Sequence, residues 1–186
     1  MRQERIVFMG TPEISKVYLQ SLIDHQYNII AAYTQPPRKQ GRGMQVQKSP
    51  VHTLSLEHNI PVYQPKNFAS YENINELKKL KPDLVVVMGY GLLLPKSILQ
   101  IPLHGCINIH VSLLPRWRGA APIEYAILNG DEKTGVSIFL LEEKLDAGPI
   151  IATQEININK NINKEDLTSE LNILGTALLI NTLSDL

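Results

Sequence analysis

The sequence predicts an α/β fold: a doubly wound, mostly parallel sheet with helices on both faces and an antiparallel strand or hairpin near the C-terminus. Short apolar runs of strand type alternate with segments whose apolar residues recur every three or four positions, as on one helix face. One run, Asp83–Met88, contains Leu-Val-Val-Val-Met, which is typical of strands in parallel sheets covered on both faces. The 186 residues are 44% hydrophobic and 19% charged, which predicts a single domain with a real core.

The first half of the chain begins with the apolar run Arg5–Met9, which Gly10-Thr11-Pro12 ends. The helix expected next carries its apolar residues on one face at positions Ile14, Val17, Tyr18 and Leu22. Ser49-Pro50 predicts a further helix to about His58, because a capping serine precedes proline at the first helical position. The other elements expected in this half are strands at Asn28–Thr34, Pro61–Tyr63 and Asp83–Met88 and a helix at Tyr71–Leu80.

The second half continues the alternation. Pro95 opens a short helix, Gly105–His110 is a strand, and Ala120–Leu128 is helical. Thr134–Leu140 and Pro149–Glu155 are strands that flank a turn, which predicts the antiparallel addition, and a helix runs from Glu165 to the end.

Doubly wound sheets bind ligands at the carboxyl ends of their strands. The loops expected at those ends are Gly10–Glu13, Gln35–Pro50, Gly89–Pro95 and Val111–Pro122. The first of these loops has one glycine and no Gly-x-Gly-x-x-Gly pattern, and the sequence has no P-loop, so neither nicotinamide nor ATP use is supported.

Composition excludes several classes of protein. Lysine plus arginine and aspartate plus glutamate each total 18, so a globally basic nucleic-acid coat is excluded and any polyanion must meet a local patch. Cys106 is the one cysteine, which excludes a disulfide scaffold and a multi-cysteine metal site. The longest apolar stretch, Leu84–Leu94, is about half of the ~20 residues of a bilayer helix. With too few apolar residues after Met1 for a signal peptide, we expect a soluble cytoplasmic protein.

Asn108-Ile109-His110 ends a predicted strand, where residues two apart project to the same side. An amide can donate to a developing oxyanion, and an imidazole can donate or shuttle a proton. An isolated Asn-x-His pattern is more often an amide that bonds loop backbone beside a half-buried histidine, so this pattern alone leaves both interpretations open.

The other polar candidates have simpler interpretations. Cys106 is expected to be a small buried hydrophobe, and the remaining histidines lack metal-ligand spacing. We expect the acids Asp131-Glu132 and Glu142-Glu143 to lie in solvated turns, and Trp117 either to stack on a base or to anchor its loop.

Motifs along the whole chain resemble the folate-dependent formyltransferases, and within that family the members that formylate methionyl-tRNA. The most specific stretch is Val111–Pro122, which reads Val-Ser-Leu-Leu-Pro-Arg-Trp-Arg-Gly-Ala-Ala-Pro. Supporting matches lie in both halves of the chain, at Phe8–Glu13, Thr34–Arg38, Gly41–Gly43, Ser49–Val51, Met88–Pro95, Gly105–His110 and Leu145–Gly148.

The resemblance implies a Rossmann-like catalytic domain over 1–186 that moves a formyl group from 10-formyltetrahydrofolate to the amine of methionine on initiator tRNA, with no metal. It implies a catalytic set of Asn108, His110 and Asp146. The segment lining the folate site would be Ser112, Leu113, Leu114 and Pro115, together with Gly89, Tyr90 and Gly91. The residues expected to contact tRNA are Arg42 with its loop neighbours Arg38 and Lys48, and Arg116 and Arg118 as part of a basic collar at the pocket mouth.

Two rival functions remain open at this point. One is formylation of a small amine, such as glycinamide ribonucleotide or an amino sugar nucleotide, for which the basic insertion Gln35–Pro50 has no evident use. The other is a non-catalytic RNA- or folate-binding remnant, which would show no turnover. The resemblance also implies a C-terminal β-barrel domain that helps to grip tRNA. We expect that domain to be absent from 1–186, either because the sequence is a piece cut at the domain boundary or because it is a naturally short form. We therefore expect weakened tRNA affinity with the catalytic set intact.

Overall fold

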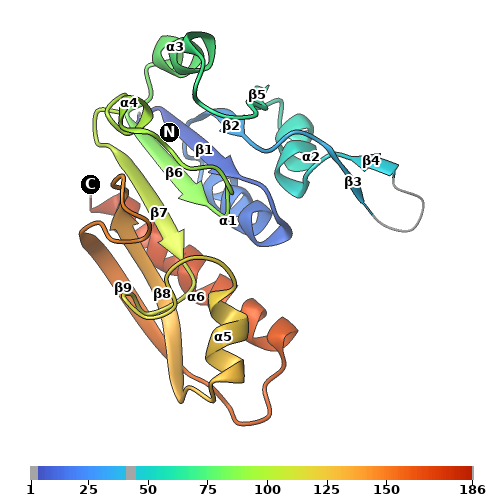
Figure 1. Cartoon of the computed structure of the whole chain (residues 1–186), viewed down its shortest axis with the longest axis vertical. Coiled ribbons are helices and arrows are strands. Elements are labelled where there is room, and N and C mark those ends of the chain that lie inside the picture. The colour runs from blue at the N-terminus through green and yellow to red at the C-terminus, as the bar shows by residue number, and fades with distance from the viewer. Residues whose placement is uncertain (1–3, 41–44, 186) are drawn as a thin grey trace. The chain divides into compact units, whose positions relative to one another are not determined.

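The structure, a computed structural model, describes residues 4–40 and 45–185 (Figure 1). The chain separates into two compact units, Met1–Cys106 and Ile107–Leu186. Among the described residues, no helix combines the length and the apolar character that crossing a bilayer requires.

The first unit contains a parallel sheet. Its strands are β1 (Ile6–Gly10), β2 (Ile29–Tyr33), β5 (Val62–Tyr63) and β6 (Leu84–Met88). They lie in the order β5-β2-β1-β6, and each neighbouring pair runs parallel. Every residue of β1 and β6 is buried. The unbroken apolar run that predicted a buried parallel strand is therefore confirmed.

The helices of the first unit follow the predicted order: α1 (Glu13–Asp24), α2 (Pro50–Glu57), α3 (Tyr71–Leu80) and α4 (Lys96–Leu99). The capping prediction is confirmed at α2, where the Ser49 hydroxyl accepts a hydrogen bond from the His52 amide at 3.0 Å. The buried face of α1 differs slightly from the expected one. Val17 is 36% exposed, and Ser15 and Leu19 are buried beside Tyr18 and Leu22.

The segment expected to be only a loop, Gln35–Pro50, contains a small antiparallel ribbon of β3 (Arg38–Gln40) and β4 (Gln45–Gln47). The ribbon projects away from the parallel sheet of its unit (Figure 1). At its base, the Thr34 and Ser49 hydroxyls, both buried, hydrogen-bond to each other at 2.7 Å. This bond joins the end of β2 to the first turn of α2, so the insertion leaves and re-enters the unit at one place.

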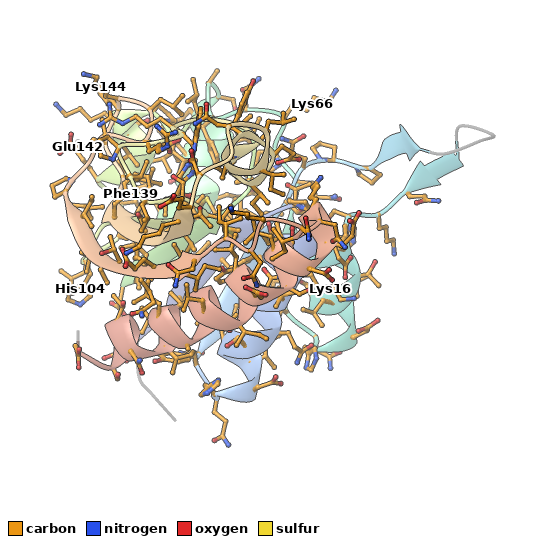
Figure 2. The ribbon with its side chains drawn as sticks, turned by 90° about the horizontal axis from the view of Figure 1, so that it is seen from below. Lys16, Lys66, His104, Phe139, Glu142 and Lys144 are labelled. Carbon is orange, nitrogen blue, oxygen red and sulfur yellow. The ribbon has the colours of Figure 1, made fainter. Side chains whose placement is uncertain are left out.

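The second unit is antiparallel. Its elements are β7 (Cys106–His110), of which Cys106 still belongs to the first unit, α5 (Pro122–Leu128), β8 (Lys133–Leu140), β9 (Ile150–Asn157) and α6 (Lys164–Ser184). β8 pairs antiparallel with both β7 and β9, which confirms the predicted C-terminal addition. Phe139 of β8 is fully buried, whereas Glu142 and Lys144 project outward from the loop that follows it (Figure 2).

The core of the second unit lies between its strands and α6. The helix packs against β8, β9 and α5. Its buried residues recur every fourth position, at Leu167, Leu171, Gly175, Leu179 and Leu183. This spacing keeps one stripe of the helix against the sheet, and the helix packs on β8, the strand that pairs with β7.

Candidate active site

The end of β7 carries the Asn-x-His pair. Register places Asn108 opposite Phe139 and His110 opposite Ser137 of β8. Their side chains share one side of the strand because they are two residues apart. His110 is buried, with 7% of its surface exposed. Asn108 is half-buried, and its amide hydrogen-bonds to no side chain or backbone group of the described residues, which leaves its N–H groups for a ligand.

His110 lies between two groups of the second unit. Its Nε2 hydrogen-bonds with the carbonyl oxygen of Trp117 at 2.8 Å. Its Nδ1 lies 3.9 Å from Oδ2 of Asp146, a separation too long for a direct hydrogen bond. The same Asp146 oxygen accepts the Gly119 amide at 2.7 Å. The structure thus brings His110 and Asp146 together, and a small group or a proton carrier can act between them.

Asp146 is positioned by its loop. It is only 8% exposed and adopts a left-handed backbone conformation, with φ of 45°, which aspartate tolerates better than most residues. The Leu140 amide donates to the Pro149 carbonyl at 2.9 Å and closes the loop. Gly148 passes so near the Leu140 carbonyl that no Cβ fits there. These constraints turn the carboxylate of Asp146 towards Gly119 and His110.

The segment Val111–Ala121 is fastened to the same unit by buried hydroxyls. The Ser112 hydroxyl donates to the Arg116 carbonyl at 2.6 Å. The Ser137 hydroxyl donates to the Ser112 carbonyl at 2.7 Å and accepts from the Leu114 amide at 3.1 Å. Since Ser137 lies opposite His110 in the sheet, one residue of β8 ties the loop to the histidine strand.

Arg116 and Trp117 converge on Asp131, whose side chain is 9% exposed. Arg116 donates through Nε and Nη2 at 2.8 and 2.6 Å, and Trp117 through Nε1 at 2.7 Å. Asn129 donates a further bond at 2.8 Å. The Arg116 guanidinium, with these other donors, holds the pKa of the Asp131 carboxyl well below its usual range. The expectation that Asp131 lies in a solvated turn is therefore wrong, because a loop distant in sequence covers it.

The indole of Trp117 is enclosed by its neighbours. The Arg116 guanidinium carbon lies 4.4 Å from the indole centroid. The Tyr125 ring stacks on the indole with centroids 5.4 Å apart and an angle of 14° between planes. With its N–H bound to Asp131 as well, Trp117 has the contacts of a loop anchor, which favours that interpretation over stacking on a base.

The residues expected to line a folate site fall in both units. In the second unit, Leu113 and Leu114 are half-buried and Pro115 is exposed, while the Ser112 hydroxyl is already occupied. In the first unit, Gly89 and Gly91 have φ of 58° and 78°. The Tyr90 side chain is buried, 6.3 Å from the Phe68 ring between centroids, so only its backbone is presented by the loop.

That Tyr90 backbone is held by Thr11 and Gln35, two residues that were not among the predicted site residues. The Tyr90 carbonyl accepts from the Thr11 hydroxyl and from the Gln35 side-chain amide, each at 3.1 Å. The backbone N–H of Gln35 donates to the Thr11 hydroxyl at 3.3 Å. Gln35 thus joins the loops that follow β1, β2 and β6 within the first unit. Only the proximity of strand ends in a parallel sheet could have pointed to it.

The residues expected to contact tRNA are only partly described. Arg118 and Lys48 are exposed, in different units. Arg116 is 52% exposed and paired with Asp131. Arg38 begins β3, and Arg42 lies outside the described residues.

Among the residues that the structure describes, no group of three or more His, Cys, Asp or Glu could hold a metal ion.

Comparison with known proteins identifies the family. A family model described as Formyl transferase matches residues 4–183. The chain is 46% identical over 183 residues to a methionyl-tRNA formyltransferase of Ehrlichia ruminantium (strain Welgevonden), covering 98% of this chain and 60% of that protein. It is 48% identical over 180 residues to one of Magnetococcus marinus, covering 97% of this chain and 58% of that protein. The chain therefore spans about 60% of the length of these curated relatives.

Solved structures show the same fold. A phosphoribosylglycinamide formyltransferase from Bacillus halodurans aligns with a TM-score of 0.80 and 28% identity, over 97% of this chain and 93% of that one. A glycinamide ribonucleotide transformylase from Geobacillus kaustophilus aligns with a TM-score of 0.81 and 24% identity, over 98% of this chain and 97% of that one. The predicted α/β fold is confirmed by these alignments and by the strand pairings. With a family match that runs through both units and a buried histidine beside an aspartate at the end of β7, the chain belongs to the formyl transferase family.

Proposed function

We propose that this chain transfers the formyl group of 10-formyltetrahydrofolate to the α-amine of methionyl-tRNA. The observation that carries the proposal is the placement of His110 within 3.9 Å of Asp146, at the end of the strand that also presents Asn108. The relatives at 46–48% identity named methionyl-tRNA formyltransferase support this acceptor. Because the family match runs through both units, we propose that residues 1–186 act as one catalytic domain.

The chemistry requires no enzyme nucleophile. The amine of an aminoacyl ester has a pKa near or below the ~7.7 of a free α-amino group, so much of it is neutral at pH 7. Its lone pair forms a bond to the formyl carbon, and the carbonyl oxygen becomes an oxyanion. The bond between that carbon and the folate nitrogen then breaks, as the amine loses a proton and the departing nitrogen gains one.

The proposed catalytic residues match these steps. The unpaired amide of Asn108 donates to the oxyanion, where one such donor is typically worth about 3 kcal/mol. His110 accepts the proton that leaves the amine and returns it to the departing nitrogen. The carboxylate of Asp146 faces the imidazole and stabilises its charged form during that transfer.

We propose binding residues for both cosubstrates. In the second unit Ser112–Pro115 contact the folate, largely through backbone and apolar groups because the Ser112 hydroxyl is engaged, and in the first unit Gly89–Gly91 are proposed folate contacts as well. Arg38, Arg42, Lys48, Arg116 and Arg118 meet tRNA phosphates. Arg116 adds little net charge there, since Asp131 pairs with it. Both proposed cosubstrates are water-soluble, and we propose the cytoplasm as the compartment.

A second acceptor is supported by the structural comparisons. The solved neighbours at 28% and 24% identity are named for the glycinamide ribonucleotide reaction. Their lower identity, against 46–48% for the methionyl-tRNA enzymes, and the projecting β3–β4 ribbon favour the tRNA acceptor.

The test compares the two acceptors in parallel assays. The 186-residue chain is incubated with 10-formyltetrahydrofolate and either charged initiator tRNA or glycinamide ribonucleotide. We expect formylmethionine on tRNA and no formylated ribonucleotide, with an Asp146→Asn variant losing the activity. Formylation of the ribonucleotide alone would replace the proposed acceptor, and binding of either substrate without turnover would contradict the proposed reaction.

A further inference from the structure

The Asp131 carboxylate accepts four hydrogen bonds. Both of its carboxylate oxygens are engaged: Oδ2 accepts from Arg116 Nε and Trp117 Nε1, and Oδ1 accepts from Arg116 Nη2 and Asn129 Nδ2. The side chain is 9% exposed. The residue is absent from the proposed catalytic set, and it lies 14 residues from Trp117 along the chain. A nearly buried carboxylate that accepts three of these four hydrogen bonds from Arg116 and Trp117 indicates a role in their loop.

This anchoring determines the orientation of Trp117. The indole is held by Asp131 through its N–H, by the Tyr125 ring and by the Arg116 guanidinium. The Trp117 backbone is left-handed, with φ of 57°, a conformation that a bulky residue adopts only when its surroundings hold it there. The anchored side chain therefore sets the direction of the Trp117 carbonyl.

The Trp117 carbonyl acts on His110. The Trp117 carbonyl is an acceptor only, so the nitrogen bound to it, Nε2, must carry the hydrogen. In the neutral imidazole the other nitrogen, Nδ1, then bears the free lone pair. That nitrogen is the one that faces Asp146, at 3.9 Å. The Trp117 carbonyl thus selects the tautomer of the histidine.

We propose that Asp131 is a positioning residue, which anchors Trp117 so that its carbonyl holds His110 as the Nε2–H tautomer with Nδ1 free to accept a proton. The inference rests on the proposed function for the identity of the reaction. In that reaction, Nδ1 takes the proton from the attacking amine as the nitrogen–carbon bond forms. The imidazolium, stabilised by Asp146, returns the proton to the folate nitrogen as its bond to carbon breaks. Asp131 itself touches neither substrate nor His110.

The first experiment compares Asp131→Ala and Asp131→Asn with a matched control, Glu155→Gln. Glu155 pairs with Lys133 at 2.7 Å, just as Asp131 pairs with Arg116 at 2.6 Å, but on the exposed surface of β8 and β9. We expect Asp131→Ala to lower kcat for formyl transfer roughly 10- to 100-fold. The asparagine variant keeps an acceptor for the indole N–H and recovers part of the loss. KM for 10-formyltetrahydrofolate stays within about twofold of wild type, and the control changes neither constant.

A double-mutant cycle separates positioning from general weakening of the fold. Trp117→Phe keeps an aromatic ring but removes the N–H that Asp131 binds. If Asp131 acts on catalysis only through its bond to the Trp117 indole, the double variant has about the same kcat as Asp131→Ala alone. Fully multiplicative losses, or a loss expressed only in KM, would overturn the positioning role. Melting temperatures of all variants verify that each remains folded at the assay temperature.

The second readout is the tautomer of His110, measured by NMR on protein labelled with ¹⁵N-histidine. The chain has five histidines, and His110→Gln identifies the signals of interest by their loss. We expect Nε2–H in the wild type and in Glu155→Gln, and a mixture of tautomers in Asp131→Ala. An unchanged tautomer in Asp131→Ala would refute the inference even in an active enzyme. Because the spectra require no substrate, they test it separately from the acceptor assay, whose failure would refute only the proposed function.

Discussion

Single residues of this chain are held by backbone groups of neighbouring loops. His110 is bound to a carbonyl and Asp146 to an amide, while the two side chains stay 3.9 Å apart. This arrangement fixes both side chains before any ligand arrives, and groups that are already in place need no reorganisation in the transition state. Asn108, in contrast, has no described partner, so its amide is available to the reaction.

The Asn108 amide gives the first prediction. Asn108→Ala should lower kcat about 100- to 1,000-fold, the cost of removing one oxyanion donor. The melting temperature should change little, because no hydrogen bond among the described residues is lost. Steady-state kinetics with methionyl-tRNA and thermal melts measure the two effects, with Asn157→Ala on the exposed part of β9 as control. A kcat within a few-fold of wild type would exclude Asn108 from the oxyanion site.

Asp131 gives a prediction about pH. Its pKa is depressed in the folded chain by Arg116 and the other donors, whereas an unfolded aspartate titrates near 3.9. Its stabilisation is therefore complete above about pH 4 and is lost as the pH falls towards the folded pKa. Asp131→Asn should be less stable than wild type at pH 7, with a difference that shrinks by pH 3. Urea unfolding at both pH values measures it, and a constant difference would contradict the linkage.

Elements of the first unit are joined at their ends by buried hydroxyls. Ser49 caps α2 by accepting from the His52 amide, and its hydroxyl also bonds to Thr34 at the end of β2. One hydroxyl thus begins a helix and holds the base of the β3–β4 ribbon.

Ser49→Ala should accordingly lower the free energy of unfolding by more than the loss of an ordinary helix cap does. Loss of the cap costs about 1 kcal/mol, and the Thr34 hydroxyl left buried without a partner adds about 1–3 kcal/mol. The measurement is the free energy of unfolding in urea. Ser169→Ala, whose exposed hydroxyl bonds only to its own helix, is the control and should change stability by a few tenths of a kcal/mol. Equal effects of the two substitutions would show that the Thr34–Ser49 bond stabilises nothing.

At the scale of the whole molecule, the formal net charge is zero. A polyanion is therefore attracted by local cations alone, and its binding should weaken with salt in proportion to the phosphates neutralised. Arg118→Ala should raise KM for charged tRNA and reduce the salt slope of log KM by about one. KM for 10-formyltetrahydrofolate should remain unchanged. Lys160→Ala, an exposed lysine between β9 and α6, is the control, and an equal effect there would argue against a specific contact at Arg118.

The order of elements was predictable because each element carries its own pattern. The strands β1 and β6 are apolar throughout, and Ser49-Pro50 marks the start of a helix by local chemistry alone. The β3–β4 ribbon was missed because its residues, Arg38–Gln40 and Gln45–Gln47, are nearly all polar and show no alternation that a strand pattern could reveal. Its pairing arises from backbone hydrogen bonds, which any sequence can supply.

The sequence by itself determined which elements form, in which order, and that Asn108 and His110 share one side at a strand end, because periodicity and spacing are local properties. Only the tertiary structure decided that Asp131 accepts hydrogen bonds from Arg116 and Trp117. The same holds for the hydrogen bond from Gln35 to the Tyr90 carbonyl, 55 residues away. It holds as well for the bond of His110 Nε2 to the Trp117 carbonyl, which leaves Nδ1 free to accept a proton. Each of these depends on hydrogen-bond distances between segments far apart in the chain. Such distances are set by packing, and a change of about an ångström in packing makes or removes the bond.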